Sequence, residues 1–376
     1  MSLVANRDSI PLRCYAADGG NITSVLQQLV TESISSRRVL DVSGGSWVYN
    51  GPGITIPNGD FLAVKGSVAG KTRITNTGGG YLFDTPDRIG NLYMADFECS
   101  GGKGLLRQSR TGIDAAAGVL RSLERMRIVE HTECGVNLNV SDGPNWQFTR
   151  CWFDAASSTG TMDVAHAGLP NDMKFDGCEF GDAQVNVKLR YINDVNFVGC
   201  SFYRTAAADT GVPRINLWCV PSSSATNLYG NQLRIIGTKF GNEFWSAEDR
   251  KIVVADEGSG ADVGTKFPVL DTASSGRLYA FHINGSKFQW DSSNPGPGIF
   301  STTPNIGFMS SVFGNSWYGS ATEAQADIPV IEWLGSLGIA DQMEEFWSVK
   351  GSDGFYRHGP SGKVVKAAGT GWQVPV

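Results

Sequence analysis

One six-residue string recurs along the chain and limits the possible folds more than any other feature. It consists of an apolar residue, two variable residues, a small residue, one variable residue and phenylalanine. The clearest copies lie at residues 148–153 (FTRCWF), 175–180 (FDGCEF) and 197–202 (FVGCSF). Weaker copies lie at residues 235–240, 283–288 and 308–313. Because the string is constant while its spacing varies, it indicates a fixed corner in a repeat architecture whose insertions fall on loops.

The string itself predicts a strand, a bend and a second strand. Its third position is glycine in four copies: Gly177, Gly199, Gly237 and Gly285. Glycine adopts a positive φ at little cost, so this position suits the bend. The small residue that follows is expected to point inward at the corner. In the three clearest copies it is Cys151, Cys178 or Cys200, and core filling explains such a thiol column better than metal or redox chemistry.

Alternating runs precede the corner strings and supply the remaining strands. Examples are residues 135–140 (GVNLNV), 185–189 (VNVKL) and 215–219 (INLWC). A period of two marks a half-buried strand. Each repeat therefore holds about three short strands, and stacked repeats place phenylalanine on phenylalanine. The sequence predicts an all-β solenoid, a parallel β-helix with three short strands per rung.

The two ends of the chain differ from its middle. Residues 24–34 (SVLQQLVTESI) place apolar side chains on one helical face and are predicted to cap the first rung, whose strand edges would otherwise be open. After about residue 328, aromatic residues appear among glycine-rich turns. The expected organisation is an N-terminal peptide with a capping helix over 1–35, the β-helix over 36–320 and a small C-terminal β region over 321–376.

Composition excludes several classes of function. The formal net charge of −6, without a basic run, argues against nucleic acid as the main ligand. No apolar stretch is long enough to cross a membrane, and the N-terminus lacks the apolar core of a signal peptide. Seven cysteines without a CxxC pair predict neither a disulfide framework nor structural zinc. We therefore expect no metal or cofactor, and we expect the protein to be synthesised in the cytoplasm.

The opening block carries a family resemblance. Its strings are residues 12–20 (LRCYAADGG), the helix over 24–34, residues 38–49 (RVLDVSGGSWVY) and residues 62–74 (LAVKGSVAGKTRI). In these strings the first 85 residues resemble the opening of bacteriophage tailspikes and depolymerases of the pectate-lyase-like, right-handed parallel β-helix superfamily. The remainder resembles the family by rung pattern alone. The acidic pair that usually precedes the capping helix is absent, and Asn21-Ile-Thr23 stands there.

This resemblance implies a homotrimer on a virion that recognises bacterial surface polysaccharide such as O-antigen or capsule. Attachment to the phage tail through the first ten residues is one arrangement that it implies. Many members of the family are glycosidases, others are lyases, and some only bind glycan. The family shares no catalytic motif that transfers by sequence, so the site must be argued from local residues.

An acidic and aromatic segment at residues 241–249 (GNEFWSAED) is the first candidate site. Glycoside hydrolysis generally needs two carboxylates, and Glu243, Glu248 and Asp249 supply three. Trp245 could stack on a sugar ring and raise the pKa of an adjacent carboxyl group. The alternative is an acidic surface turn with a packed aromatic pair.

The outer face of the alternating strands is the second candidate. If Val185 and Val187 point inward, then Asn186, Lys188 and Arg190 point outward. The same alternation places further side chains outside, among them Asp163, Asn216 and Trp218. Amide, cation and indole groups on one face suit sugar hydroxyls and carboxylates, and Asp163 adds a fourth candidate catalytic carboxylate. The alternative is an ordinary solvated sheet face. The histidines at 131, 166, 282 and 358 are scattered and predict no catalytic group.

Three functions remain open on these residues. The leading hypothesis is an endo-acting polysaccharide depolymerase that hydrolyses glycosidic bonds with two carboxylates. A lyase acting on a uronate glycan is the second, because Lys188, Arg190 and Tyr191 could neutralise the uronate and abstract a proton. The third is a non-catalytic adhesin or structural spike. New reducing ends, unsaturated uronic products or binding without products would distinguish the three.

Overall fold

The computed structural model describes most of the first 254 residues and selected strands beyond them. The described residues are 9–57, 59–68, 70–86, 89–108, 119–139, 142–157, 160–190, 192–203, 214–220, 232–241, 250–254, 280–289, 299–301, 311–313, 316–318, 331–333, 349–350, 354–357, 364–368 and 371–373.

Three long parallel sheets, here called A, B and C, form the body of the molecule. Sheet A contains β1 (Ser9–Pro11), β2 (Val39–Asp41), β5 (Gly59–Lys65), β8 (Ile89–Ala95), β11 (Arg121–Glu124), β14 (Asp142–Pro144), β15 (Trp146–Thr149), β18 (Leu169–Asp176), β21 (Asn193–Val198), β24 (Gln232–Ile236), β27 (Ala280–Asn284) and β30 (Ser311–Phe313). Sheet B contains β3 (Ser46–Tyr49), β6 (Arg73–Asn76), β9 (Glu98–Gly101), β12 (Arg127–His131), β16 (Trp152–Ala155), β19 (Glu179–Gly181), β22 (Ser201–Tyr203), β25 (Lys239–Phe240), β28 (Lys287–Gln289) and β31 (Ser316–Tyr318).

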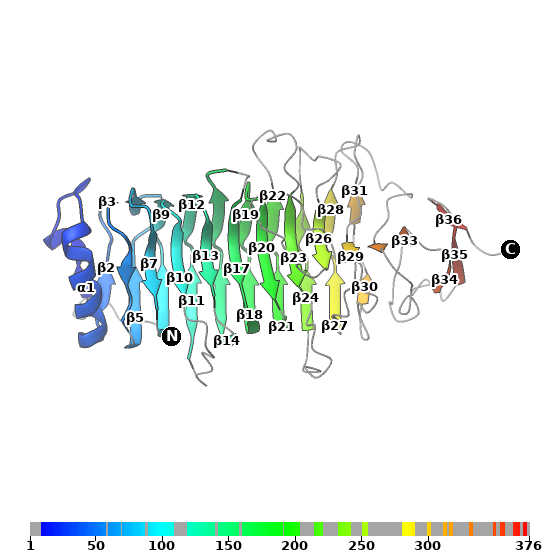
Figure 1. The fold of residues 1–376 in the computed structure, drawn as a ribbon, viewed down its shortest axis with the longest axis horizontal. Coiled ribbons are helices and arrows are strands. Elements are labelled where there is room, and N and C mark those ends of the chain that lie inside the picture. The colour runs from blue at the N-terminus through cyan, green and yellow to red at the C-terminus, as the bar shows by residue number, and fades with distance from the viewer. Residues whose placement is uncertain are drawn as a thin grey trace.

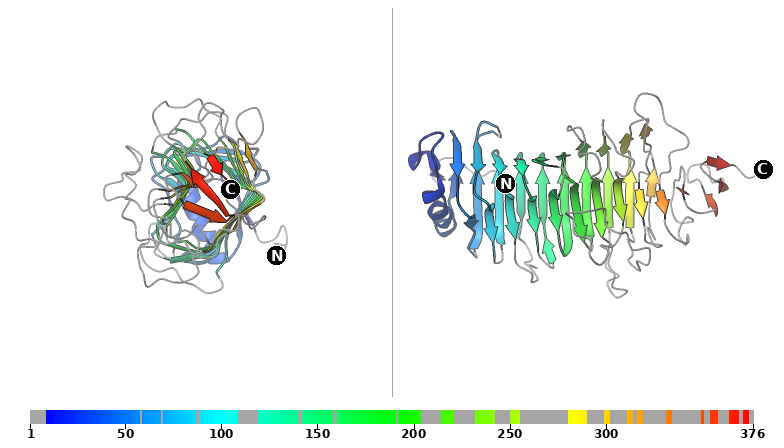
Figure 2. Two further views of the ribbon diagram at one scale, coloured as in Figure 1. Left: turned by 90° about the vertical axis from the view of Figure 1, so that its right-hand side faces the viewer. Right: turned by 45° about the horizontal axis from the view of Figure 1, so that its top comes forward.

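Sheet C contains β4 (Ile54–Thr55), β7 (Tyr81–Thr85), β10 (Gly104–Gln108), β13 (Cys134–Leu138), β17 (Met162–His166), β20 (Val185–Arg190), β23 (Ile215–Val220), β26 (Arg250–Val254), β29 (Ile299–Ser301), β32 (Ile331–Trp333) and β33 (Val349–Lys350). Along most of the body the chain visits sheets A, B and C in turn and then returns to A one rung further on. Figures 1 and 2 show these rungs stacked along one axis. The chain is a parallel β-helix, which confirms the all-β prediction of three strands per rung.

The predicted corner joins sheet A to sheet B. Its bend has a positive φ of 52° at Arg150, 61° at Gly177 and 60° at Gly199. The residue after each bend is buried, with Cys178 at 0% exposure. The bend therefore turns the small side chain of each string into the core, as the sequence predicts.

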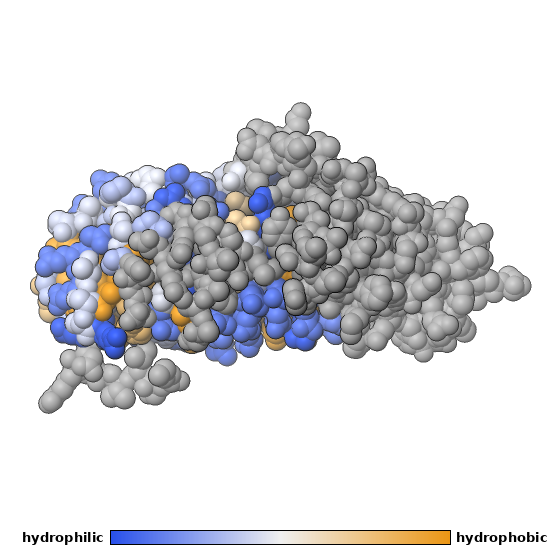
Figure 3. Space-filling view, turned by 60° about the horizontal axis from the view of Figure 1, so that its bottom comes forward, coloured by the Kyte–Doolittle hydropathy of each residue, from blue (hydrophilic) through white to orange (hydrophobic). Residues whose placement is uncertain are grey.

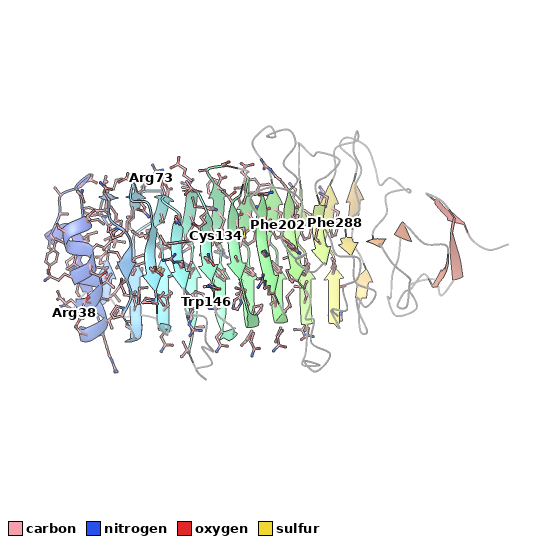
Figure 4. The ribbon with its side chains drawn as sticks, in the orientation of Figure 1. Arg38, Arg73, Cys134, Trp146, Phe202 and Phe288 are labelled. Carbon is pink, nitrogen blue, oxygen red and sulfur yellow. The ribbon has the colours of Figure 1, made fainter. Side chains whose placement is uncertain are left out.

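Phenylalanine rings stack in two rows inside the solenoid. In sheet A the ring centroids of Phe148 and Phe175 lie 4.8 Å apart, and those of Phe175 and Phe197 lie 4.5 Å apart. The row in sheet B has centroid spacings of 5.2, 4.8, 4.9 and 4.8 Å along Phe153, Phe180, Phe202, Phe240 and Phe288. Figure 4 labels Phe202 and Phe288 in this row. These spacings match the separation of neighbouring strands, so the rings follow the backbone register.

The sixth copy of the string, predicted at residues 308–313, is wrong by four residues. Val312 in β30 pairs with Ile283, and Trp317 in β31 pairs with Phe288. The copy in register is therefore 312–317 (VFGNSW), with tryptophan in place of phenylalanine. The strand register thus puts tryptophan at the position where the other copies have phenylalanine, so a search limited to phenylalanine misses this copy.

The helix expected over 24–34 is α1 (Thr23–Ser36), which follows a 3-10 turn at Leu12–Cys14. The Asn21 side chain accepts a hydrogen bond from the Thr23 backbone N–H at 2.9 Å, and Arg37 ends the helix with a φ of 54°. Leu26 and Val30 are buried in the main core. The helix lies at the N-terminal end of the stack, beside β2 and β5 (Figure 1).

Toward the other end, β32 and β33 extend sheet C as far as Lys350. A separate antiparallel sheet follows, formed by β34 (Gly354–Arg357), β35 (Val364–Ala368) and β36 (Gly371–Gln373). In the face shown in Figure 3, the described surface is mostly hydrophilic with small separate apolar patches. Within the described part of the chain, no helix is long and apolar enough to cross a membrane.

Candidate functional site

The polar side chains predicted to line the outer face of sheet C are nearly all buried. Exposure is 0% for Asp163, 2% for Asn186, 4% for Asn216, 9% for Lys188 and 1% for Trp218. Burying polar groups is costly unless they are paired, so the direction and partners of each side chain decide its role. Arg190, at the end of β20, is half-buried.

Asp163, Asn186 and Asn216 point into the solenoid. The strand register aligns these three residues in one column with Leu105 and Gly135. Leu105 belongs to the main hydrophobic core. A Cβ atom placed on Gly135 would lie 3.2 Å from the side chains of both Ile128 and Phe153, which are core residues of sheet B. The column therefore faces the interior.

Hydrogen bonds connect this column from rung to rung. Asn216 Nδ2 donates to Asn186 Oδ1 at 2.9 Å, and Asn186 Nδ2 donates to Asp163 Oδ2 at 2.8 Å. His131 Nε2 lies 3.1 Å from Asp163 Oδ1, and both side chains are fully buried. Lys251, aligned one rung beyond Asn216, is also fully buried, and its Nζ donates to a backbone carbonyl at 3.2 Å. We call these five residues the internal polar column.

The predicted outward direction is thus wrong for Asp163, Asn186 and Asn216. The physical reason lies in the first residue of each strand. Val185, expected inside, packs instead in a separate apolar cluster with Trp218 and other residues of sheet C, outside the main core. The second and third residues of the strand then both face inward, which strict alternation does not allow.

Lys188 and Trp218 do lie on the outer face, as predicted. The Lys188 Nζ lies 4.4 Å from the centre of the Trp218 ring, within the range of a cation–π contact. Burial, reinforced by the charge of Arg190, lowers the pKa of Lys188 to about 8. Both side chains are nearly inaccessible to solvent.

The outer face of sheet B carries a more accessible acidic group. Phe153 points into the core, so its strand neighbours Trp152 and Asp154 point outward, and both are half-buried. Burial and the charges of Asp182 and Asp163 raise the pKa of Asp154 to about 7, although His131 and Arg127 oppose the shift. The Asp154 carboxyl group is therefore protonated in mildly acidic solution and titrates around neutral pH.

A second carboxylate lies one rung away. Asp154 pairs with Gly181, and Asp182 is the next residue along the chain, with a φ of 58°. Asp182 is 9% exposed, and its Oδ1 lies 3.5 Å from Nη1 of the buried Arg214. The ion pair with Arg214 accounts for the burial of the Asp182 carboxylate.

Two aromatic rings stand beside these carboxyl groups. The Trp152 Nε1 donates a short hydrogen bond to the Tyr203 hydroxyl, which comes from two rungs further on. Tyr203 lies over Gly181, where a Cβ atom would come within 2.5 Å of the tyrosine ring. The Arg127 guanidinium lies 4.1 Å from the Trp152 ring centre and 2.7 Å from a carboxylate oxygen of Glu98. An indole beside paired carboxyl groups can hold a sugar ring against an acid.

We call Trp152, Asp154, Asp182, Tyr203 and Arg214 the acid–aromatic site. Its two carboxylates were not among the sequence candidates, although the corner string could have located them. Asp154 is the first residue after Phe153, and Asp182 is the second after Phe180. The candidates Glu243, Trp245, Glu248 and Asp249 lie outside the described residues.

The fold and the acid–aromatic site together define a parallel β-helix protein in which Asp154, on the outer face of sheet B, lies one rung from the buried ion pair of Asp182 and Arg214. No family model and no curated protein sequence matches the chain.

The fold of the chain is similar to that of three solved structures. The Agl-KA catalytic domain has 10% identity over 93% of this chain and 69% of that one, with a TM-score of 0.43. The A-module of the Azotobacter vinelandii mannuronan C-5 epimerase AlgE4 has 14% identity over 87% and 100%, with a TM-score of 0.43. The gp42 tailspike of an Acinetobacter phage has 10% identity over 89% and 64%, also with a TM-score of 0.43. Similarity at this level transfers no activity, so the function rests on the residues of this chain.

Proposed function

We propose that this chain is an endo-acting depolymerase that hydrolyses glycosidic bonds in a bacterial surface polysaccharide such as O-antigen or capsule. The observation that carries the proposal is Asp154, a carboxyl group whose pKa burial and neighbouring carboxylates raise to about 7. It stands on an outer sheet face beside Asp182 and two aromatic rings. General acids in catalysis work best when their pKa lies near the working pH.

In the proposed reaction Asp154 donates its proton to the glycosidic oxygen as the bond to the anomeric carbon breaks. Asp182 is the second carboxylate. Asp182 follows Gly181, the residue one rung away that pairs with Asp154, and a retaining mechanism needs the two carboxyl groups roughly 5–5.5 Å apart. Asp182 would then attack the anomeric carbon, and Asp154 would deprotonate the water that releases the sugar. Trp152 and Tyr203 would position the sugar ring.

The carboxylates Glu243, Glu248 and Asp249, with Trp245, form the competing catalytic set. The residues Asn186 and Asn216, first considered for substrate binding, have the internal partners of the polar column, and Asp163 is fully buried among them. We therefore assign these three a supporting role inside the solenoid and keep Trp218, Lys188 and Arg190 as candidates for substrate contacts on sheet C.

Incubation with polysaccharides of the host range tests the proposal. New reducing ends should appear, and Asp154→Asn should lower their rate of release about 10²- to 10⁴-fold. Asp176→Asn is the matched control, because Asp176 is a solvent-accessible carboxylate on the outer face of sheet A. Full activity in Asp154→Asn, with loss in Glu243→Gln or Glu248→Gln, would move catalysis to the competing set.

A lyase is the second candidate, and the lowered pKa of Lys188 favours it. An amine with a pKa of about 8 is a serviceable base for removing a proton beside a uronate carboxyl group. Such a reaction would release unsaturated uronic products that absorb in the ultraviolet, and Lys188→Ala would abolish them. Binding to cells with no product of either kind would instead identify an adhesin.

The family resemblance of the opening block supports a further proposal on assembly. That resemblance implies that each chain is a right-handed parallel β-helix, and that three chains form a homotrimer attached to a phage tail through their first ten residues. We propose that the region after about residue 320 contributes to the trimer. Sedimentation of the full chain at micromolar concentration should give three times the monomer mass, and a stable monomer would contradict it.

A further inference from the structure

We propose that the polysaccharide bound at the acid–aromatic site is acidic, and that Arg73 and Arg127 bind an anionic group on a sugar unit next to Trp152. The inference rests on the proposed function, because it names the substrate class of that same outer face of sheet B. The net charge of −6 gives the chain no general attraction for an acidic polymer. Binding such a polymer therefore requires positive charge at the site itself.

The strand register places both arginines in one row with Trp152. Arg73 pairs with Glu98, and Glu98 pairs with Arg127. Arg127 pairs in turn with Trp152. Ile128, the residue after Arg127, belongs to the main core, so the row lies on the outer face of sheet B. Rungs are about 4.8 Å apart, so the row extends roughly 14 Å from Trp152 to Arg73, which Figure 4 labels toward the end of the stack beside α1.

One buried carboxylate, that of Glu98, holds the two arginines together. The Glu98 side chain is fully buried, and one of its oxygens pairs with Arg73 Nε while the other lies 2.7 Å from Arg127 Nη1. A buried carboxylate is costly unless it is paired, and here it is paired from both sides. Two cations around one carboxylate leave an excess of one positive charge on this part of the surface.

The donors that Glu98 does not use are accessible from outside. The side chain of Arg73 is 45% exposed and that of Arg127 is 30% exposed. Within the described part of the chain, both Nη groups of Arg73 and the Nη2 group of Arg127 have no partner. Guanidinium groups present planar sets of N–H donors that match the oxygens of a carboxylate or a phosphate.

Arg127 is already held in place before any ligand binds. Its guanidinium lies 4.1 Å from the ring centre of Trp152 and is fixed at Nη1 by Glu98. A Cβ atom on the exposed Gly70, whose φ is 88°, would lie 3.3 Å from Arg127 Nη1. A side chain at position 70 would therefore crowd the guanidinium, and glycine leaves it open. A group that is fixed in advance loses little conformational freedom when an anion binds.

The next rung on the other side of Trp152 has the opposite charge. Glu179 pairs with Trp152 there and is exposed. An anionic group is thus attracted to the Arg127 side of the indole and repelled from the adjacent position on the Glu179 side. We therefore expect the acidic sugar unit to lie between Trp152 and α1.

An array of purified O-antigen and capsule polysaccharides of known structure tests the inference. Each acidic polysaccharide is printed in its native form and in a neutral form, with its carboxyl groups reduced to primary alcohols or its phosphate groups removed. The polysaccharides that the chain retains should carry a carboxylate or a phosphate, and neutralisation should weaken their binding about tenfold or more. The treatment that weakens binding shows which of the two anionic groups is recognised.

Substitutions then assign the effect to the two arginines. Arg73→Gln and Arg127→Gln should each weaken binding of the native polysaccharide about tenfold and leave binding of its neutral form unchanged. Arg234→Gln is the matched control, because Arg234 is 40% exposed and pairs with the Asp194 carboxylate but lies on the outer face of sheet A. It should change the binding of neither form. If Arg127→Gln fails to fold, Arg73→Gln alone decides.

A structural role for the arginines would weaken binding of both forms equally, and that result would overturn the inference. Equal binding of native and neutral forms, or retention of no acidic polysaccharide, would also overturn it. Release of reducing ends from neutral polysaccharides alone would support the proposed hydrolysis and contradict the acidic substrate. Conversely, arginine-dependent retention of an acidic polysaccharide without any product would support this inference and overturn the hydrolase.

Discussion

Two columns of side chains run along the interior of the solenoid, and their polar groups find hydrogen-bond partners in different ways. In the corner between sheets A and B, each cysteine contacts the backbone of the preceding rung: Cys151 Sγ lies 3.2 Å from the Leu123 carbonyl oxygen, and Cys178 Sγ lies 3.3 Å from that of Phe148. In the internal polar column, Asn216, Asn186 and Asp163 bond to one another through their side chains.

This difference in hydrogen-bond partners determines whether a substitution on one rung also affects a side chain on the next rung. A backbone carbonyl is present on every rung, so other small donors can occupy the corner. On later rungs these are Thr238 and Ser286, whose hydroxyls donate to the carbonyls of Ile236 and Asn284 in their own strings. A side-chain acceptor is present only if the neighbouring rung supplies it. Each side chain of the polar column therefore depends on its neighbour for a hydrogen-bond partner, and removing one member leaves another buried group unpaired.

The largest expected effect concerns the aromatic row beside the corner. Phe175→Ala should lower the free energy of unfolding by roughly 3–5 kcal/mol, because the ring is fully buried between Phe148 and Phe197. Chemical denaturation followed by fluorescence measures the change. A loss no greater than that of the surface variant Asp176→Asn would show that the inward register is wrong.

A smaller effect is expected within the polar column. Asn216→Leu removes the donor to Asn186 Oδ1 and leaves that oxygen buried, which should cost about 1–3 kcal/mol. The same denaturation experiment applies, with Leu217→Ile in the neighbouring core position as a control for shape. A neutral or stabilising result would mean that the column is not mutually dependent.

The corner should tolerate the corresponding change. Cys178→Ser exchanges one donor for another, and the hydroxyl can reach the carbonyl that the thiol now contacts. We expect a loss of about 1 kcal/mol or less. A loss of unfolding free energy as large as that of Asn216→Leu would show that the two columns do not differ in this way.

A further prediction is that the stability of the folded chain depends on pH through Asp154. The folded-state pKa of Asp154 is about 7, above the value of about 3.9 in an unfolded chain. Between these values the folded state retains a proton that the unfolded chain has lost, so stability falls as pH rises. In Asp154→Asn this contribution disappears. The melting temperature of the variant relative to the unmodified chain should therefore increase from pH 4.5 to pH 8, and a constant difference would argue against the raised pKa.

The candidate site shows where reasoning from sequence reached its limit. The corner string identified β16 and β19 through Phe153 and Phe180, and the two carboxylates lie one and two residues after those phenylalanines. They remained unrecognised because Asp154 and Asp182 are distant in sequence from each other and from Arg214. Only the stacking of rungs brings them onto one face. Denser acidic segments, such as the one containing Glu243, attracted the prediction instead.

The sequence by itself determined the repeat, the parallel β-helix, the helix near the N-terminus and the inward phenylalanine rows. These follow from local chemistry, since glycine favours the bend and a period of two sorts apolar from polar side chains. Tertiary structure alone decided that Asn186 points inward and Val185 outward, because the turn from sheet B to sheet C changes the phase of the strand. It also decided the proton affinity of Asp154, which depends on charges contributed by other rungs and on the water that the solenoid excludes.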